Sequence, residues 1–188
     1  VGYRAGLFVT TGTENTLIGG SAGDAITTGL NHVAVGMKAL SSDTTGRYSV
    51  AIGHSALENQ NFSGNNEAYN VAVGFSAGND ITTGIRNTYI GALAGDHTTD
   101  ADHNVAVGFD ALSTNVLGSK SVAVGTDALS AANPVDGSGN NVATDMYNVA
   151  VGYQAGVSVS TGTVNTLVGA LAGEQITTGI QNTFFGGL

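Results

Sequence analysis

The chain of 188 residues contains no cysteine, no tryptophan and a single proline, and only 10% of its residues are charged. Without cysteine it can form neither disulfides nor thiolate metal sites, so packing alone must hold it together. A single proline excludes collagen and proline-rich linkers. Hydrophobic residues make up 41% of the chain, which places it away from intrinsic disorder and predicts an ordered core.

Basic residues are also scarce. Five Lys and Arg stand against 14 Asp and Glu, which gives a formal net charge of -9. The chain has no basic run that could neutralise phosphates, and its charge is unfavourable at an anionic membrane surface. No apolar run reaches the length of a membrane span. We therefore expect no nucleic-acid partner and no membrane insertion in this segment.

Glycine is abundant, with 29 residues, and it is periodic. One motif recurs eleven times, with central glycines at Gly2, Gly19, Gly36, Gly53, Gly74, Gly91, Gly108, Gly125, Gly152, Gly169 and Gly186. Eight of the ten spacings are 17 residues, and the other two are 21 and 27. Constant spacing with occasional longer units is typical of a solenoid that carries loop insertions.

The positions around the central glycine are equally regular. Alanine stands three residues after it in all ten copies that reach that far, and the residue before it is Val, Ile or, once, Phe. A small polar residue, usually Asn, stands four before it, and a second glycine often stands seven before it, behind paired threonines. We expect each unit to form a strand, a turn, a short threonine-bearing strand and a turn. A helix needs a longer uninterrupted run than these glycines leave.

A longer rhythm of four units overlies the short one. The residue after the recurring alanine alternates in pairs between glycine and leucine: Gly6, Gly23, Leu40, Leu57, Gly78, Gly95, Leu112, Leu129, Gly156 and Gly173. Both insertions, 58–69 and 130–147, follow the second leucine of a set, so we expect them to project from the same side.

These patterns predict an all-β fold, a parallel β-roll or β-solenoid of about eleven coils of 17 residues. Seventeen extended residues give a perimeter of about 58 Å, which two layers about 10 Å apart nearly exhaust. The coil must therefore be flat, without room for a ligand cavity. Residues 1–188 form one such segment, and because both ends fall inside the motif we expect it to belong to a longer fibre.

The strand residue two before the central glycine is apolar in every coil. Since neighbouring strand residues point to opposite faces, we expect this column to point outward when its two neighbours point inward. An exposed apolar column of this length needs a cover, and a homotrimer would supply it. The alternative is a monomeric solenoid with one apolar face. The predicted trimer interface is Leu17, Ala34, Ala51, Ala72, Tyr89, Ala106, Ala123, Ala150, Leu167 and Phe184.

The motif N-V-A-V-G at 70–74, 104–108 and 148–152 resembles the head repeats of YadA-like trimeric autotransporter adhesins. The sequence N-T-Y-I-G at 87–91, followed by Ala94 and Gly95, is similar to repeats of phage tail fibres. The resemblance covers the whole chain. It implies a left-handed parallel β-roll in a trimer, located outside the cell on a virion tail fibre or a bacterial surface, with no catalytic residues. The 17-residue unit and the four-coil rhythm depart from the adhesin pattern and favour the phage fibre.

Three groups of residues are candidate sites. His97, Asp100, Asp102 and His103 are the residue types that bind divalent metal, although a polar turn would have the same composition. His54 and Ser55 are adjacent, but adjacent strand residues diverge and cannot form a nucleophile and its base. The two insertions are candidate receptor-contact loops, because recognition concentrates in loops on rigid scaffolds. Their possible anchors are Phe62, Tyr69, Met146 and Tyr147.

The sequence thus predicts a structural and receptor-binding segment of an extracellular trimeric fibre, most like a phage tail fibre. Its partners would be two further copies of itself and a host-surface receptor of unknown type. The first alternative is the head of a bacterial trimeric autotransporter adhesin. An alternative of another class is an ice- or polysaccharide-binding solenoid that uses the stacked threonines near Thr10, Thr27, Thr44, Thr82 and Thr177. No feature indicates an enzyme or a cofactor.

Overall fold

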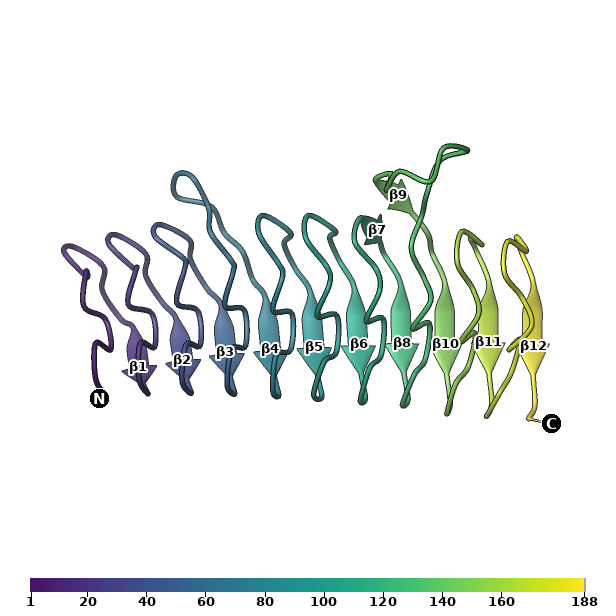
Figure 1. Ribbon diagram of the computed structural model, residues 1–188, viewed down its shortest axis with the longest axis horizontal. Helices are drawn as coiled ribbons and strands as arrows, with labels where there is room; N and C mark the ends of the chain where they lie inside the picture. Colours follow the sequence, from purple (N-terminus) through teal and green to yellow (C-terminus); the bar gives the residue numbers. More distant parts are fainter. Residues whose placement is uncertain (188) are drawn as a thin grey trace.

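The computed structural model describes residues 1–187 and is all-β, a flattened solenoid of stacked coils (Figure 1). Ten three-residue strands form one sheet along its length, and two short strands form a second. The strands are β1 (Thr16–Ile18), β2 (Val33–Val35), β3 (Val50–Ile52), β4 (Val71–Val73), β5 (Thr88–Ile90), β6 (Val105–Val107), β7 (Gly118–Ser119), β8 (Val122–Val124), β9 (Thr144–Asp145), β10 (Val149–Val151), β11 (Thr166–Val168) and β12 (Thr183–Phe185). The predicted β-solenoid with 17-residue coils is confirmed.

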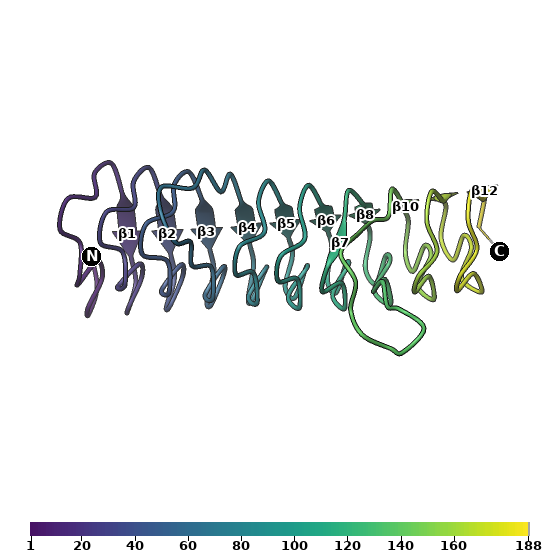
Figure 2. The ribbon, with the colours of Figure 1, turned by 90° about the horizontal axis from the view of Figure 1, so that it is seen from above.

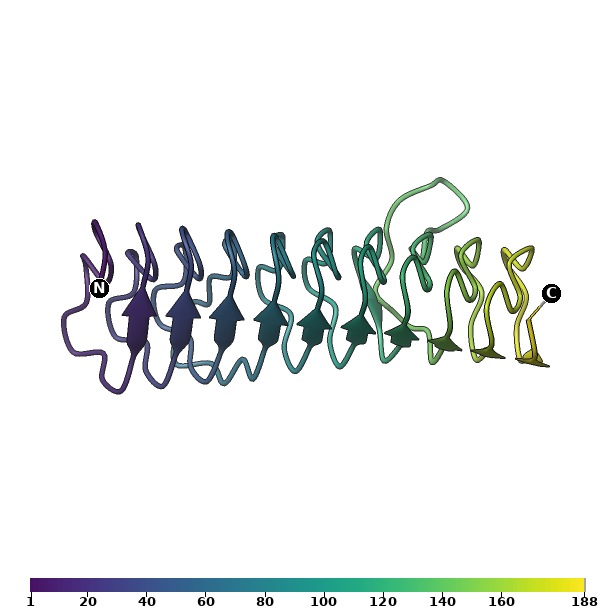
Figure 3. The ribbon, with the colours of Figure 1, turned by 90° about the horizontal axis from the view of Figure 1, so that it is seen from below.

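Each strand of the main sheet pairs in parallel with the strand of the next coil. Thr16 lies opposite Val33, and the same position faces itself along the whole sheet, including across both insertions. The hydrogen bonds between strands therefore run along the long axis. Figures 2 and 3 show the sheet as a single row of strands along one side of the coil.

The prediction of a second, threonine-bearing strand in each coil is wrong. The backbone N–H groups of Thr27, Thr28 and Gly29 all donate to one acceptor, the carbonyl of Thr44 in the next coil. Three donors converging on one oxygen form a turn, because a strand ladder needs alternating donors and acceptors. Only β7 and β9 form a short second sheet, where the insertion 130–147 rejoins the coil.

The prediction that the apolar column of the strands points outward is also wrong. The residue two before the central glycine points into the coil, and Ala34, Tyr89 and Leu167 are fully buried, as are the other members except at the two ends of the stack. Only Leu17 is half-buried and Phe184 is exposed. The alternation of strand side chains holds, but the inward residue is the middle one of the strand, which is alanine in six of the ten coils. The predicted trimer interface is therefore the core.

The four-coil alternation of glycine and leucine after the recurring alanine follows from the space available inside the coils. In four coils alanine at the inward strand position goes with leucine after the recurring alanine, as in Ala106 with Leu112. The coils of Ala72 and Ala150 have glycine there, because the next coil carries a large inward residue: a Cβ on Gly78 would lie 2.9 Å from Tyr89 Cδ2, and one on Gly156 would lie 2.6 Å from Leu167 Cδ1. A large inward residue requires glycine there instead. A Cβ on Gly173 would lie 2.7 Å from Leu167 Cδ2, and one on Gly95 would lie 2.6 Å from Tyr89 Cζ. The choice of leucine or glycine after the recurring alanine thus offsets the size of the inward strand residues that pack against it.

The central glycine is required by the stacking distance. Gly108 has φ +139°, a conformation that side chains rarely adopt, and a Cβ there would stand 2.5 Å from the carbonyl oxygen of Gly125 in the next coil. The other central glycines that have a coil above them meet the same obstacle. Glycine at this position allows the backbones of neighbouring coils to come into contact.

Both insertions rise from the same edge of the solenoid, the upper edge in Figure 1. The second one then swings out on the side away from the main sheet (Figures 2 and 3). Among residues 1–187 the structure contains no helix that could cross a membrane.

Candidate functional site

The outer face of the main sheet is largely apolar, with threonine as the first residue of four strands, Thr16, Thr88, Thr166 and Thr183. It consists of the residues three before, one before and one after the central glycine, which we call the outer sheet face. In β3, β5 and β10 the residues Ile52, Ile90 and Val151 are exposed on it. The ring of Phe75, 55% exposed, stacks on that of His54 with centroids 5.3 Å apart. Further exposed members are Ile18, Met37, Phe109, Tyr153 and Phe185.

No Asp, Glu, Lys or Arg occurs at these three positions in any of the ten coils of the main sheet. Ten strands about 4.8 Å apart and five residues wide give a flat area of roughly 600 Å². That is at the upper limit of the apolar patches that soluble monomers expose. Depletion of charge and enrichment in apolar side chains are features of the centre of a protein interface.

A ladder of buried asparagines fixes the corner where the chain enters each strand. The Asn104 side chain donates to the Gly118 carbonyl at 2.8 Å and accepts from the Ser121 N–H at 2.9 Å. The same bonds recur at Asn70, Asn87, Asn148 and Asn165. Each amide satisfies two backbone groups at the corresponding corner of the next coil, so the predicted corner at this position has a direct physical cause.

Three coils have another residue at the asparagine position: His32, Ser49 and Ser121. His32 and Ser49 lie in adjacent coils and contact each other. His32 Nε2 lies 2.8 Å from the Gly46 carbonyl, and its Nδ1 accepts the Ser49 N–H. Asp43 and Gln60 complete this buried cluster, with Gln60 Nε2 2.7 Å from Asp43 Oδ2. Burial lowers the pKa of His32, against the opposing effect of the Asp43 carboxylate. The imidazole is therefore held neutral.

The cluster contains serine, histidine and aspartate, but it is sealed. All three residues are fully buried, and the Ser49 hydroxyl bonds the Gln60 amide rather than the His32 ring. The geometry replaces the missing asparagines and holds no nucleophile beside a base. Sequence reasoning missed this cluster, although His32 and Ser49 in the asparagine column marked its place.

The insertions supply both buried and exposed residues. Phe62 is 3% exposed and Met146 is fully buried, so the expectation that they contact a receptor is wrong for these two. They are apolar anchors that hold the insertions to the coil. Tyr69 and Tyr147, 44% and 49% exposed, are available at the surface, directly before the corner asparagines.

Tyr69 and Tyr147 belong to a column that sequence reasoning did not identify. The residue five before each central glycine has φ between 50° and 63°, a left-handed conformation, in all ten coils of the main sheet. In the middle of the chain six successive members are aromatic or basic. We call them the corner column: Tyr48, Tyr69, Arg86, His103, Lys120 and Tyr147.

A depression of about 350 Å³ lies beside this column. Asn65, Asn66 and Glu67 line it from the first insertion, and Thr83 and Arg86 line it from the next coil. Phe62 and Ile85 complete the lining, so the depression offers hydrogen-bonding groups beside two apolar side chains and suits a ligand with polar groups and an apolar face.

The four candidate metal ligands do not converge. Asp100 accepts the hydroxyls of Thr82 and Thr83, and Asp102 accepts the N–H of Ile85. His97 pairs with Asp96 at 3.2 Å, whereas His103 contacts Arg86. Within residues 1–187 no three His, Asp or Glu side chains form a group that could hold a metal ion.

The threonine hydroxyls are largely used inside the structure. Thr10 and Thr27 each donate to a backbone carbonyl of the next coil at 3.0 Å, and Thr99 does so at 3.2 Å. These bonds join coils, which leaves fewer hydroxyls free to face an ordered surface. His54 is exposed and Ser55 is buried, as expected for two residues that diverge.

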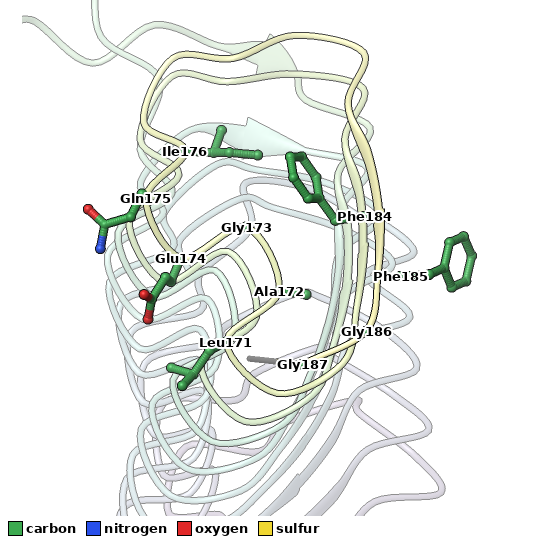
Figure 4. A pocket seen from close by; sticks show the side chains of 10 residues that line it. All are labelled: Leu171, Ala172, Gly173, Glu174, Gln175, Ile176, Phe184, Phe185, Gly186 and Gly187. Atoms are coloured by element: carbon green, nitrogen blue, oxygen red, sulfur yellow. The ribbon is translucent and has the colours of Figure 1, made fainter.

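A further hollow, of about 520 Å³, is the interior of the last coil seen end-on (Figure 4). Ala172 and Ile176 line it with Phe184, and these positions form the core in the other coils. It is therefore part of the stacking surface between coils and not a site with its own chemistry.

Three comparisons, with family models, curated proteins and solved structures, found no match for this chain.

Proposed function

We propose that this chain is a structural and receptor-binding segment of an extracellular trimeric fibre. The observation that carries the proposal is the outer sheet face, a long apolar surface without a formal charge. A surface of this kind is costly in water, and a copy of the same chain is the occupant that would match its length and repeat coil for coil. Three copies would each bury this face along a common axis.

The trimer proposed here uses other residues than the sequence suggested. The inward column is the core, so the contact between copies consists of the outer sheet face, with Val107 near its centre and Phe75 and Phe109 at its margin. Each chain would contribute roughly 600 Å² of flat area, before side-chain relief is counted, and this area would be divided between its two neighbours in the trimer.

The rest of the architecture suits a shaft. The coils stack in register, and the insertions project from one edge. A phage tail fibre is the form we favour, on the 17-residue unit and the four-coil rhythm. The head of a bacterial trimeric adhesin is the second form, on the N-V-A-V-G motif.

Sedimentation equilibrium at micromolar concentration tests the assembly. We expect a mass three times that of one chain, independent of concentration above the dissociation constant. A mass of one chain would refute the trimer and with it the fibre. Immunogold labelling with an antibody against the second insertion then distinguishes the two forms, since it would decorate either virion tails or cell surfaces.

A further inference from the structure

The cations of this acidic protein gather at the corner column. The chain has only five Lys and Arg in total, and three of them, Arg47, Arg86 and Lys120, lie at this corner or next to it. Arg47 directly precedes Tyr48, and His103 stands between the other two cations. Most of the few basic side chains of a chain of net charge -9 thus lie along one corner.

The six members of the column contact one another in three successive pairs along the axis. The rings of Tyr48 and Tyr69 stack with centroids 5.1 Å apart and planes 6° from parallel. Arg86 Nη1 lies 3.4 Å from His103 Nε2, and Lys120 Nζ lies 5.3 Å from the centre of the Tyr147 ring. The result is a row of three pairs of flat and cationic groups, in which Tyr69 ends the first insertion and Tyr147 ends the second.

The carboxylates beside the depression are already engaged. Glu67 Oε2 accepts the Tyr69 hydroxyl at 3.1 Å, and Asp100 and Asp102 accept from threonine hydroxyls and from the Ile85 N–H. Lys120 is also neutralised, by Asp145 at 2.6 Å. Arg86 differs, because among residues 1–187 no carboxylate oxygen lies within 4.0 Å of its guanidinium.

A guanidinium with free donors pairs with a carboxylate through two parallel hydrogen bonds. The amides of Asn65 and Asn66, in the same depression, can bond hydroxyl groups, and the adjacent tyrosines offer an amphipathic aromatic surface. Carboxylate, hydroxyls and a partly apolar ring face occur together in acidic sugars. A densely charged polyanion fits less well, since the surrounding acids would repel it.

We propose that the depression and the corner column bind a saccharide that carries a carboxylate group, with Arg86 pairing with that carboxylate. The inference deepens the receptor-binding part of the proposed function and rests on it. The ligand would lie along the edge from which both insertions rise, between Tyr69 and Tyr147.

Saturation-transfer NMR and calorimetry with four defined sugars test the proposal. The acidic probes are tetragalacturonate and sialyllactose, and their neutral counterparts are galactotetraose and lactose. We expect binding of at least one acidic probe, none of its neutral counterpart, and weaker binding at high salt. Arg86→Gln should lower the affinity by about 10- to 100-fold, because it removes a charge-assisted hydrogen bond.

Lys38→Gln is the matched control, since it removes one positive charge that is paired with Glu58 outside the corner column. It should bind like the unmodified chain, and unchanged melting of both variants shows that they fold. Failure to bind either acidic probe, equal binding of the neutral ones, or full affinity of the Arg86 variant would each overturn the proposal. A trimer that binds no acidic sugar refutes this site alone, whereas a monomer that binds one refutes the fibre alone.

Discussion

The ring of Tyr89 fills the space that a side chain at residue 95 would need: a Cβ on Gly95 would lie 2.6 Å from Tyr89 Cζ. Tyr89 is fully buried and donates its hydroxyl to Thr98 at 3.1 Å. Tyr89 and Gly95 thus occupy the positions that Ala106 and Leu112 hold in the next coil, and the strands of the two coils still pair in register.

This exchange predicts a compensating pair of substitutions. Tyr89→Ala should lower the free energy of unfolding by about 3–5 kcal/mol, because it leaves a cavity in a closed interior. Adding Gly95→Leu should recover part of that loss, since Leu112 adopts the same left-handed conformation one coil further on. Gly95→Leu alone should destabilise the chain by overpacking. Denaturant melts of the three variants measure the coupling, and additive effects would contradict the volume argument.

Substitution of a central glycine should lower stability more than substitution of a glycine in an insertion. Gly108→Ala should cost at least about 2 kcal/mol, from the strained φ and the overlap with the Gly125 carbonyl. Gly137→Ala is the matched control, because a Cβ there would meet nothing within 4 Å. The two variants can be compared in the same thermal melts. Equal melting temperatures would show that the coils can move apart at little cost.

The sequence predicted the coil length, the strand position and the corner, because each depends on a local requirement that recurs every 17 residues. It did not reveal which side of the strand faces inward. Alternation allows the middle strand residue to point either inward or outward. The outward prediction for Ala34 and Tyr89 is wrong, because valine on either side favours the core as strongly as the middle residue does. The pairing of Tyr89 with Gly95, and of Ala106 with Leu112, was visible in the sequence and would have identified the inward column.

The candidate site was less predictable, because it depends on contacts between coils. Tyr69 and Tyr147 were identified from their place in the insertions, but Arg86, which belongs to a coil of ordinary length, was not. Phe62 and Met146 are as apolar as a receptor anchor, and only the packing of the insertion shows that they are buried. The acidic turn with His97 and Asp100 could not be separated from a metal site until the partners of each side chain were known.

Neutral, buried His32 predicts a sensitivity to acid. Because its pKa is lowered in the folded state, the unfolded state binds more protons below about pH 6.5. Its contribution to stability is therefore complete above that pH and is lost as the pH falls toward the folded pKa. His32→Asn, which restores the residue of the neighbouring ladder, should reduce the drop in melting temperature between pH 7.5 and pH 5.

His97 serves as a control with the opposite sign. Partial burial lowers its pKa, but the Asp96 carboxylate outweighs this, so the pKa is raised. Protonation of His97 then favours the folded state as the pH falls through the folded pKa, and His97→Asn should increase the drop in melting temperature. If His32→Asn leaves the drop unchanged, the histidine does not govern the acid response.

The outer sheet face predicts a substitution that separates assembly from folding. Val107 lies near the centre of that face, and Val107→Glu would place a charge in the contact between copies. We expect the trimer to dissociate to single chains that keep the circular dichroism of the coil. Ser138→Glu, at the exposed tip of the second insertion, should leave the trimer intact. A trimer that survives Val107→Glu would place the contact elsewhere.

The direction of the hydrogen bonds in the main sheet has a mechanical consequence. Because they lie along the long axis, tension on the two ends would part the coils one after another. Each coil that opens would lengthen from about 4.8 Å to about 58 Å of extended chain. A shaft built in this way would yield in small steps under load and absorb a sudden pull before it tears.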